Sequence, residues 1–196
     1  MDLVDLDVTL PDLPYEVRRK VTVPLDLRLT DLHLVLQAVM GWDNAHLYDF
    51  ACGRKLRWAD MDDYYEEHGD RRLKTSTLAD ILAEMGRHKV FVYTYDMGDS
   101  WEHVIQPSKP YAGGGDGAGF ALTLAEGSCP PDDSGGVSGF CYMLDCLADP
   151  TSDEREDYVD WLGAESWDTR ADVADLTARL AKLGKRLAKR YAATTG

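Results

Sequence analysis

The sequence has no long apolar run, little positive charge and few cysteines, and each shortage excludes a class of protein. No window approaches the ~18 uninterrupted apolar residues of a membrane-spanning helix. There are 21 Lys and Arg against 35 Asp and Glu, a net charge of −14, which argues against a surface generally suited to phosphate backbones or anionic membranes. The acidic residues 1–7 lack the cationic and apolar parts of a signal peptide. We therefore expect a cytoplasmic protein without a membrane span.

Motifs of several common site types are also missing. The four cysteines include no C-x-x-C pair, so they are expected to be reduced thiols rather than ligands of a structural zinc. The glycine-rich stretch 113–119 follows no strand and opens no helix, which favours a flexible linker over a dinucleotide-binding loop. No G-x-S-x-G, Walker-type or H-E-x-x-H motif occurs. The length of 196 residues predicts one domain, residues 1–196.

Strand patterns fill the first two-thirds of the chain, and helix patterns follow. Alternation of apolar and polar residues predicts a hairpin from 6–10 and 15–23. Further strands are predicted over 46–52, 90–95, 100–105 and 120–125, and helices over 31–40, 77–82, from a Ser138 cap, over 152–162 with a Thr151/Glu154 capping box, and over 171–191. Residues 60–70 are expected to be a solvated insertion. This order predicts an α+β fold, an antiparallel sheet with helices packed on it from the C-terminal third.

The hairpin near residue 97 carries the sharpest group of candidate catalytic residues. A two-residue turn at 97–98 pairs Asp96 with Asp99, close enough to hold one hard cation or share a proton. The same register pairs Val92 with His103, roughly 13 Å along the strand at about 3.4 Å per residue, too far to bind the same ion. The alternative is that the aspartates cap the turn and His103 packs against a neighbouring element.

The segment 129–136, Cys-Pro-Pro-Asp-Asp-Ser-Gly-Gly, is the second group. Asp132 and Asp133 can project into a cleft, and Gly135 and Gly136 permit close approach of a ligand or another backbone. The alternative is a rigid entry to a helix, in which the acids bond backbone amides near the helix N-terminus.

Cys129 is a candidate nucleophile with His46 or His103 as its base, against the alternative of a buried structural thiol. Five side chains would together supply mixed ligands for zinc or another transition metal if they converged: His33, His46, His103, Cys129 and Asp133. No spacing requires that convergence. The metal and any other cofactor therefore stay unassigned.

The predicted terminal helix carries the opposite charge to the rest of the chain. Its bases are Arg179, Lys182, Lys185, Arg186, Lys189 and Arg190, and no acid follows residue 178. Without these six, 15 bases face 35 acids, so residues 1–178 carry −20. A basic amphipathic helix can bind nucleic acid, a membrane or a protein groove. The alternative is that its leucine face docks on the protein's own acidic body.

Three blocks together resemble a known family. They are Gly41-Trp42 followed by His46-Leu47, then Tyr-Asp-x-Gly-Asp-x-Trp-x-His at 95–103, and the segment 129–136. Their order and spacing, over roughly residues 3–183, are similar to those of the plasmid pRiA4b ORF-3-like family. The resemblance implies a compact single-domain α/β roll found on plasmids and as a passenger of insertion elements, with no assigned activity.

One function is expected, and two alternatives stay open. The expected function is that of a cytoplasmic accessory or interaction protein with a protein partner, binding through Trp42, His46, Trp101, Cys129, Asp132, Gly135 and Gly136. The first alternative is a metal-dependent hydrolase of a phosphoester or amide, with candidate catalytic residues Asp96, Asp99, His103 and Asp133. The second alternative is a DNA-associated protein whose contact with nucleic acid is confined to residues 179–190. The sequence leaves the oligomeric state open.

Overall fold

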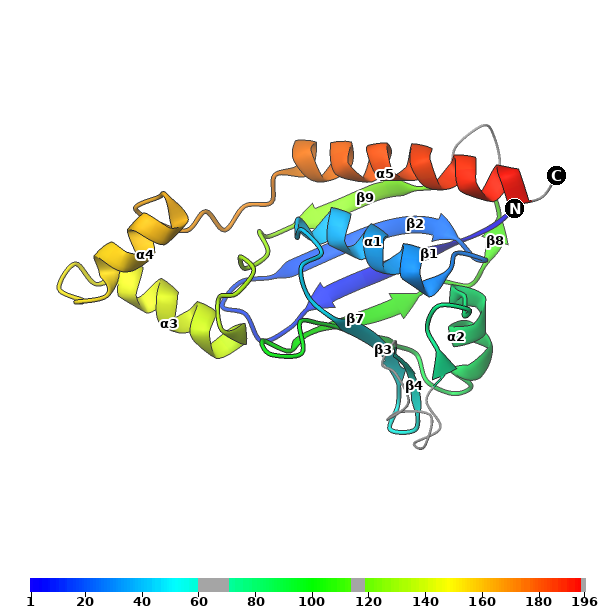
Figure 1. The fold of residues 1–196 in the computed structure, drawn as a ribbon, viewed down its shortest axis with the longest axis horizontal. Coiled ribbons are helices and arrows are strands. Elements are labelled where there is room, and N and C mark those ends of the chain that lie inside the picture. Colours follow the sequence, from blue (N-terminus) through cyan, green and yellow to red (C-terminus); the bar gives the residue numbers. More distant parts are fainter. Residues whose placement is uncertain (60–70, 114–118, 195–196) are drawn as a thin grey trace.

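The computed structural model describes residues 1–59, 71–113 and 119–194 (Figure 1). The predicted insertion at 60–70 and most of the predicted linker at 113–119 lie outside these residues. The described strands are β1 (Asp2–Leu10), β2 (Val17–Pro24), β3 (Tyr48–Cys52), β4 (Leu56–Ala59), β5 (Arg71–Arg72), β6 (Phe91–Tyr95), β7 (Trp101–Pro107), β8 (Tyr111–Ala112) and β9 (Ala121–Glu126). The helices are α1 (Leu29–Met40), α2 (Leu78–Glu84), α3 (Gly136–Ala148), α4 (Arg155–Leu162) and α5 (Val173–Thr194).

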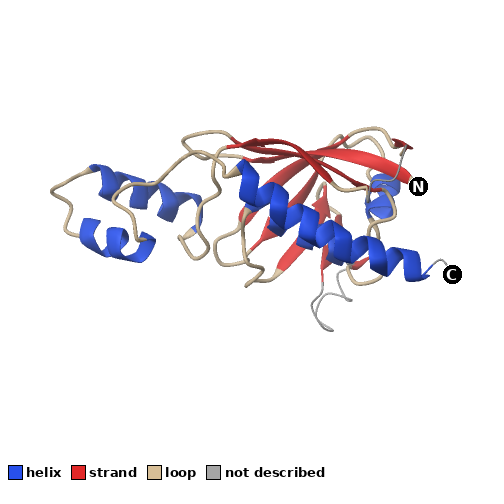
Figure 2. Ribbon diagram, turned by 90° about the horizontal axis from the view of Figure 1, so that it is seen from above, coloured by secondary structure: helices blue, strands red, loops and turns tan. Residues whose placement is uncertain are grey.

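All nine described strands belong to one sheet in the order β5-β4-β3-β6-β7-β1-β2-β9, with β8 beside the start of β1. The pairs are antiparallel apart from β4 with β5. α1 and α5 pack against each other and α5 also contacts β9, whereas α3 and α4 project from one end of the sheet (Figures 1 and 2). The α+β class predicted from the sequence is confirmed. No helix among the described residues is both long and apolar enough to cross a membrane.

The core lies between the sheet and α1. Along β1, Val4, Leu6, Val8 and Leu10 are buried and alternate with more exposed residues, as the period of a strand requires. Each fully buried Val or Leu contributes roughly 1.5–3 kcal/mol to folding. The hairpin predicted from 6–10 and 15–23 is confirmed as β1 and β2.

The predicted register of the β6–β7 hairpin is wrong by one residue. Tyr95 pairs with Trp101 and Tyr93 with His103, so the connection contains five residues, 96–100, instead of two. A one-residue shift moves a side chain to the opposite face of a sheet. It therefore places Tyr93, Tyr95, Trp101 and His103 together on the buried face, and removes the predicted facing pair of Asp96 and Asp99.

The longer loop has a local cause. Asp96 and Ser100 both adopt left-handed backbone conformations, with φ of 57° and 56°. The Ser100 N–H donates to the Asp96 carbonyl at 2.6 Å, and Asp96 Oδ1 accepts from the N–H groups of Gly98 and Asp99 at 2.8 and 3.3 Å. Aspartate tolerates this conformation because its short side chain bonds the local backbone.

Two predicted helix starts are also wrong. α3 begins at Gly136, before the predicted Ser138 cap, because Gly135 turns the chain with a φ of 81°. α4 begins at Arg155 without a side-chain cap. The N–H and hydroxyl of Thr151 instead donate to the Asp149 carboxylate at 2.8 and 2.7 Å, so Thr151 belongs to the preceding turn.

Candidate functional site

Three side chains from separate segments meet at one end of the sheet: His46, Asp96 and Asp133, hereafter the His–Asp–Asp trio. His46 Nδ1 lies 3.6 Å from Asp96 Oδ2, and His46 Nε2 lies 3.3 Å from Asp133 Oδ1. Each residue offers one ligand atom, and these atoms lie within 4.8 Å of one another. Throughout residues 1–59, 71–113 and 119–194, this is the one group of three His, Cys, Asp or Glu side chains so closely spaced.

Asp96 is held in place by the loop that it stabilises. Its Oδ1 bonds the Gly98 and Asp99 amides, which leaves Oδ2 directed at His46. Its backbone N–H donates to the Leu47 carbonyl at 2.9 Å, which joins this loop to the segment that carries His46. The same aspartate therefore shapes the turn and faces the histidine.

The segment 42–46 positions His46 against Tyr95. The Trp42 indole N–H donates to the Pro130 carbonyl at 2.8 Å, and the Ala45 N–H donates to the Tyr95 hydroxyl at 3.1 Å. The His46 ring meets the Tyr95 ring edge to face, with centroids 5.7 Å apart. These contacts attach the segment both to β6 and to the loop that carries Asp133.

Asp99 and Gly136 bring the Asp133 loop to the hairpin. Asp99 Oδ2 accepts from the Gly135 N–H at 3.0 Å, and a Cβ on Gly136 would lie 2.5 Å from the Asp99 carbonyl oxygen. Gly136 also has a φ of 66°, so both the close approach and the backbone conformation require glycine at this position. The prediction that Asp96 and Asp99 share a cation is therefore wrong, since Asp99 positions a backbone and Asp133 takes its place beside Asp96.

Asp132 is the fourth acid at this site. Its Oδ1 is buried and has no hydrogen-bond partner within the described residues. Burial raises the pKa of the Asp132 carboxyl, with a smaller raising effect from Asp133, whereas the Asp43 backbone, the Tyr95 hydroxyl and His46 lower it. A carboxyl next to the trio thus retains a proton to a higher pH than an exposed aspartate does.

His103 and Trp101 lie in the core rather than at the site. Both are fully buried, and the Trp101 and Trp42 ring centroids are 6.1 Å apart. His103 Nδ1 lies 2.9 Å from the Trp101 carbonyl and 3.2 Å from that of Tyr93, and burial lowers the pKa of the imidazole to about 4. This placement favours the packing alternative for His103.

Cys129 and His33 are likewise separated from the trio. Burial raises the pKa of the Cys129 thiol to about 12, and its Sγ lies 3.9 Å from an Arg19 nitrogen, which favours a structural thiol over a nucleophile. His33 stacks on Tyr48 with centroids 3.5 Å apart. Of the five candidate ligands named from the sequence, only His46 and Asp133 belong to the trio.

Arg19 is a supporting residue that the sequence did not indicate. It is fully buried in β2, and its guanidinium donates to the carbonyls of Val39 at 2.7 Å, Glu126 at 2.5 Å and Gly127 at 2.8 Å. These bonds join the end of α1 to the end of β9, the two points from which the site loops leave. In the sequence, Arg19 lies between Arg18 and Lys20 in a predicted strand, and nothing in this pattern marks it as the buried one of the three.

The fold and site thus define a class, an α+β protein whose single mixed sheet carries a histidine and two aspartates at the end where β6 and β7 meet. The chain belongs to the plasmid pRiA4b ORF-3-like protein family, whose model matches residues 2–175. It is 36% identical over 194 residues to the uncharacterized protein y4hQ of Sinorhizobium fredii (strain NBRC 101917 / NGR234), covering 94% of this chain and 97% of that protein.

A solved structure is similar as well. The crystal structure of a protein of unknown function, MM3350 from Methanosarcina mazei Go1, superposes with a TM-score of 0.72 at 28% identity, covering 87% of this chain and 94% of that one. The family resemblance predicted from the sequence is confirmed, and the relatives carry no assigned activity.

Proposed function

We propose that the His–Asp–Asp trio binds a divalent cation and that the protein is a metal-dependent hydrolase. The observation that carries this proposal is the meeting of one imidazole and two carboxylates from three distant segments. Nitrogen and oxygen ligands of this kind suit Zn²⁺ or Mn²⁺. Three protein ligands also leave coordination positions open for water, the arrangement of catalytic rather than structural metal sites.

The spacing of the trio supports a shared ion. Ligands about 2.0–2.2 Å from one metal lie roughly 3–3.5 Å from each other. The 3.6 Å separation between His46 Nδ1 and Asp96 Oδ2 is close to this range, whereas Asp133 Oδ1 lies 3.3 Å from the other ring nitrogen, Nε2. One imidazole nitrogen binds the ion, and the Asp133 side chain, which is 75% exposed, is free to turn toward it.

The surrounding residues suit hydrolysis of a phosphoester or amide. A bound cation supplies Lewis acidity and lowers the pKa of its water. Asp132, which interacts electrostatically with His46 and Asp133 and has a raised pKa, would accept the proton of that water. The water oxygen would then bond to phosphorus or carbonyl carbon, the bond to the leaving group would break, and the leaving group would take up the proton that Asp132 accepted.

Titration calorimetry of chelator-treated protein with MnCl₂ and ZnCl₂ tests the metal site. We expect saturable binding of one ion, weakened at least tenfold in Asp133→Asn and His46→Gln. Glu102→Gln removes an exposed acid from the same hairpin and is expected to leave binding unchanged. Absence of saturable binding, or equal binding by Asp133→Asn, would contradict the site. Metal binding without turnover of p-nitrophenyl phosphate, its diester or a p-nitroanilide would contradict the hydrolase alone.

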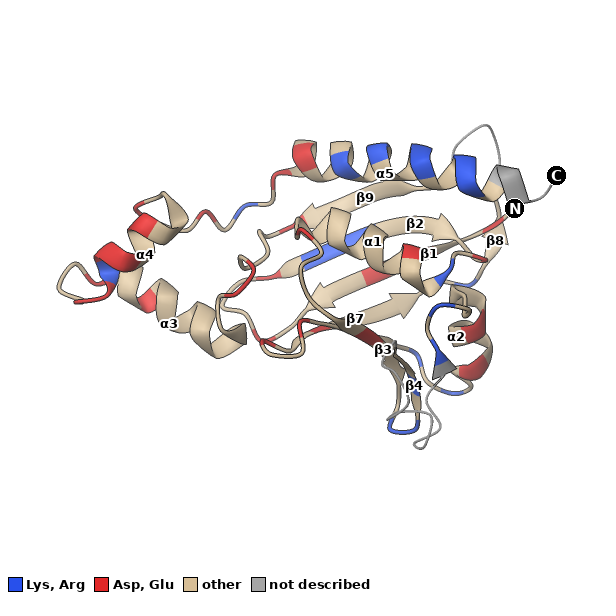
Figure 3. Cartoon of the chain, in the orientation of Figure 1, with Lys and Arg blue, Asp and Glu red and all other residues tan. Residues whose placement is uncertain are grey.

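A second function is favoured by the α3–α4 arm, residues 136–162. The arm projects from the sheet and carries many of the acidic residues (Figures 1 and 3). α4 has no buried residue, and its Trp161 is 49% exposed. An exposed tryptophan on a projecting element is typical of a protein contact. We propose on this basis that the arm binds a protein partner, and the family membership adds the proposal of an accessory role in the cytoplasm, associated with mobile elements.

A further inference from the structure

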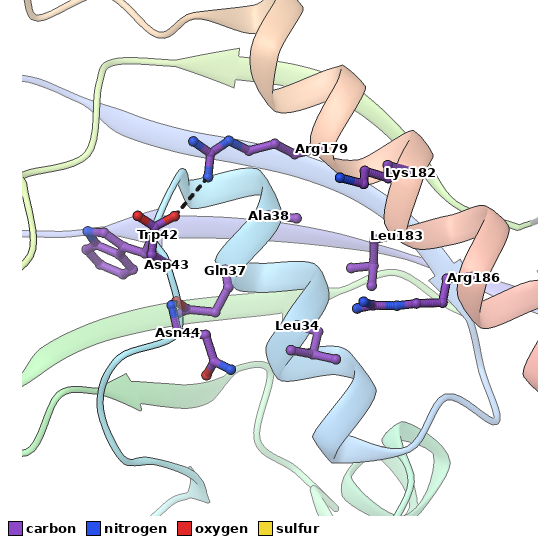
Figure 4. Close-up of a pocket in the computed structure, with 10 residues that line it drawn as sticks. All are labelled: Leu34, Gln37, Ala38, Trp42, Asp43, Asn44, Arg179, Lys182, Leu183 and Arg186. Carbon is purple, nitrogen blue, oxygen red and sulfur yellow. Dashed lines mark hydrogen bonds and ion pairs between the residues drawn. The ribbon is translucent and has the colours of Figure 1, made fainter.

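A groove of about 770 Å³ lies between α1 and α5, beside their contact (Figure 4). It is lined by apolar, polar and basic side chains: Leu34, Gln37, Ala38, Trp42, Asp43, Asn44, Arg179, Lys182, Leu183 and Arg186. The apolar lining comes from both helices, whereas all three bases come from α5. This volume is typical of a site for a small molecule, about 300–1,000 Å³.

Ion pairs fix α5 at both ends of the groove. At one end, Arg179 lies 3.3 Å from Asp43 and 2.6 Å from Asp175. At the other, Arg190 forms an ion pair with the buried Asp31, and the Tyr191 hydroxyl donates to the same carboxylate at 2.9 Å. The helix is thus held over α1, and the bases between the two ends are not needed to attach it.

Lys182 and Arg186 lie between these ends without acidic partners. Neither has an ion pair or side-chain hydrogen bond within the described parts of the chain, and both point from α5 toward α1 (Figure 4). They are four residues apart on one helix, a spacing at which like charges repel. The single acid of the groove, Asp43, is already paired with Arg179. In a protein of net charge −14, the groove therefore has unbalanced positive charge.

We propose that this groove binds an organic phosphate, a phosphate ester with an apolar or aromatic body. The Arg186 guanidinium offers paired N–H donors to phosphate oxygens, and the Lys182 ammonium adds a point charge. Leu34, Ala38 and Leu183 provide the apolar contact for the body of the ligand.

The groove adjoins, along the chain, the segment that carries His46 of the trio. Trp42, Asp43 and Asn44 line it, and the chain reaches His46 two residues later. As the substrate site of the hydrolase, the groove rests on the proposed function and narrows the substrate from phosphoester or amide to phosphoester. Binding in the groove does not require the metal.

Fluorescence anisotropy with a fluorescently labelled adenosine monophosphate, in the presence of EDTA, tests the groove. We expect saturable binding that inorganic phosphate displaces and that weakens at least tenfold in Lys182→Ala/Arg186→Ala. The matched control, Lys185→Ala/Lys189→Ala, removes the same charge from positions of α5 that do not line the groove and is expected to change the Kd less than twofold. Thermal melts of both variants verify that they fold.

Three results would overturn the proposal. They are no saturable binding of the nucleotide, equal weakening by the two double variants, or a labelled single-stranded oligonucleotide that binds with a steep salt dependence and outcompetes the nucleotide. The last result would assign α5 to nucleic acid instead. Because EDTA is present, failure here leaves the metal titration unaffected, and failure of the metal titration leaves this binding unaffected.

Discussion

At the scale of single residues, His46 and His103 show how the local environment gives the same side chain different properties. His46 is partly exposed and faces two carboxylates. His103 is fully buried, meets the Trp42 ring edge to face at 5.2 Å, and has no partner for Nε2 within the described residues. Burial, with a smaller effect of Arg19, lowers the pKa of His103 to about 4. The first histidine is partly exposed beside two carboxylates, and the second is held neutral in the core.

The lowered pKa of His103 predicts loss of stability in mild acid. Its pKa in the unfolded chain is about 6.5, so between pH 6.5 and 4 the unfolded state binds a proton that the folded state does not. The free energy of unfolding therefore falls as the pH falls through this window, by ~1–3 kcal/mol from this residue. Urea unfolding at pH 7.5, 6 and 5 measures the fall, to which His33, with a pKa also lowered to about 4, adds.

His103→Gln isolates this contribution, because its amide can donate to the same backbone carbonyls but does not titrate. We expect the variant to lose less stability than the wild type between pH 7.5 and 5. Parallel pH dependences of the two proteins would contradict the assignment.

At the scale of elements, α5 shows how a basic helix is attached to an acidic protein. Leu176, Leu180, Leu183 and Leu187 form one buried face, as the sequence pattern indicates. Gly184 allows close packing on the sheet side, since a Cβ there would lie 3.2 Å from Phe120. The leucine face of α5 thus docks on the rest of the protein, which is the alternative given for this helix from the sequence. The lysines and arginines of its outer face remain exposed.

Leu187→Ala tests how much this docking contributes. Leu187 is fully buried, with 0% of its surface exposed to solvent, so we expect a loss of about 2–5 kcal/mol in the free energy of unfolding. Lys185→Ala, on the exposed face, is expected to change it by less than about 0.5 kcal/mol. Denaturant unfolding at pH 7.5 compares them, and equal effects would show that α5 is not part of the cooperative fold.

At the scale of the whole molecule, charge and shape are unevenly distributed. Bases gather on α5 and acids on the α3–α4 arm and on the loops at the site (Figure 3). The net charge of −14 is therefore an average over surfaces of opposite charge. The arm extends away from the sheet that holds the trio (Figures 1 and 2), so partner binding and chemistry would occupy different parts of the molecule.

Trp161→Ser tests the arm as a protein contact. Since Trp161 is half exposed, we expect the free energy of unfolding to change by less than about 0.5 kcal/mol, whereas capture of a cross-linked partner falls several-fold. Met97→Ser, at an exposed apolar position of the β6–β7 loop, is the control. Capture that is identical for wild type and Trp161→Ser, quantified by mass spectrometry, would exclude the tryptophan from the contact.

The sequence by itself determined the fold class and the longer elements, whereas the short strands β4, β5 and β8 were not predicted. Hydrophobic periodicity is a local property, so the β1–β2 hairpin, the core face of α1 and the leucine face of α5 are all readable from residue spacing. The acids and histidines of the site were also recognisable as candidates, since Asp96, Asp133 and His46 stand out by residue type.

Only the tertiary structure decided which of these candidates meet. The β6–β7 register depends on left-handed conformations at Asp96 and Ser100, and the approach of the Asp133 loop depends on Gly136 lying against the Asp99 carbonyl. The first is a choice among backbone conformations of nearly equal local energy. The second is a contact between segments that are far apart in the chain. Residue spacing carries no information about them, and so the partner of Asp96 became His46 and Asp133 rather than Asp99.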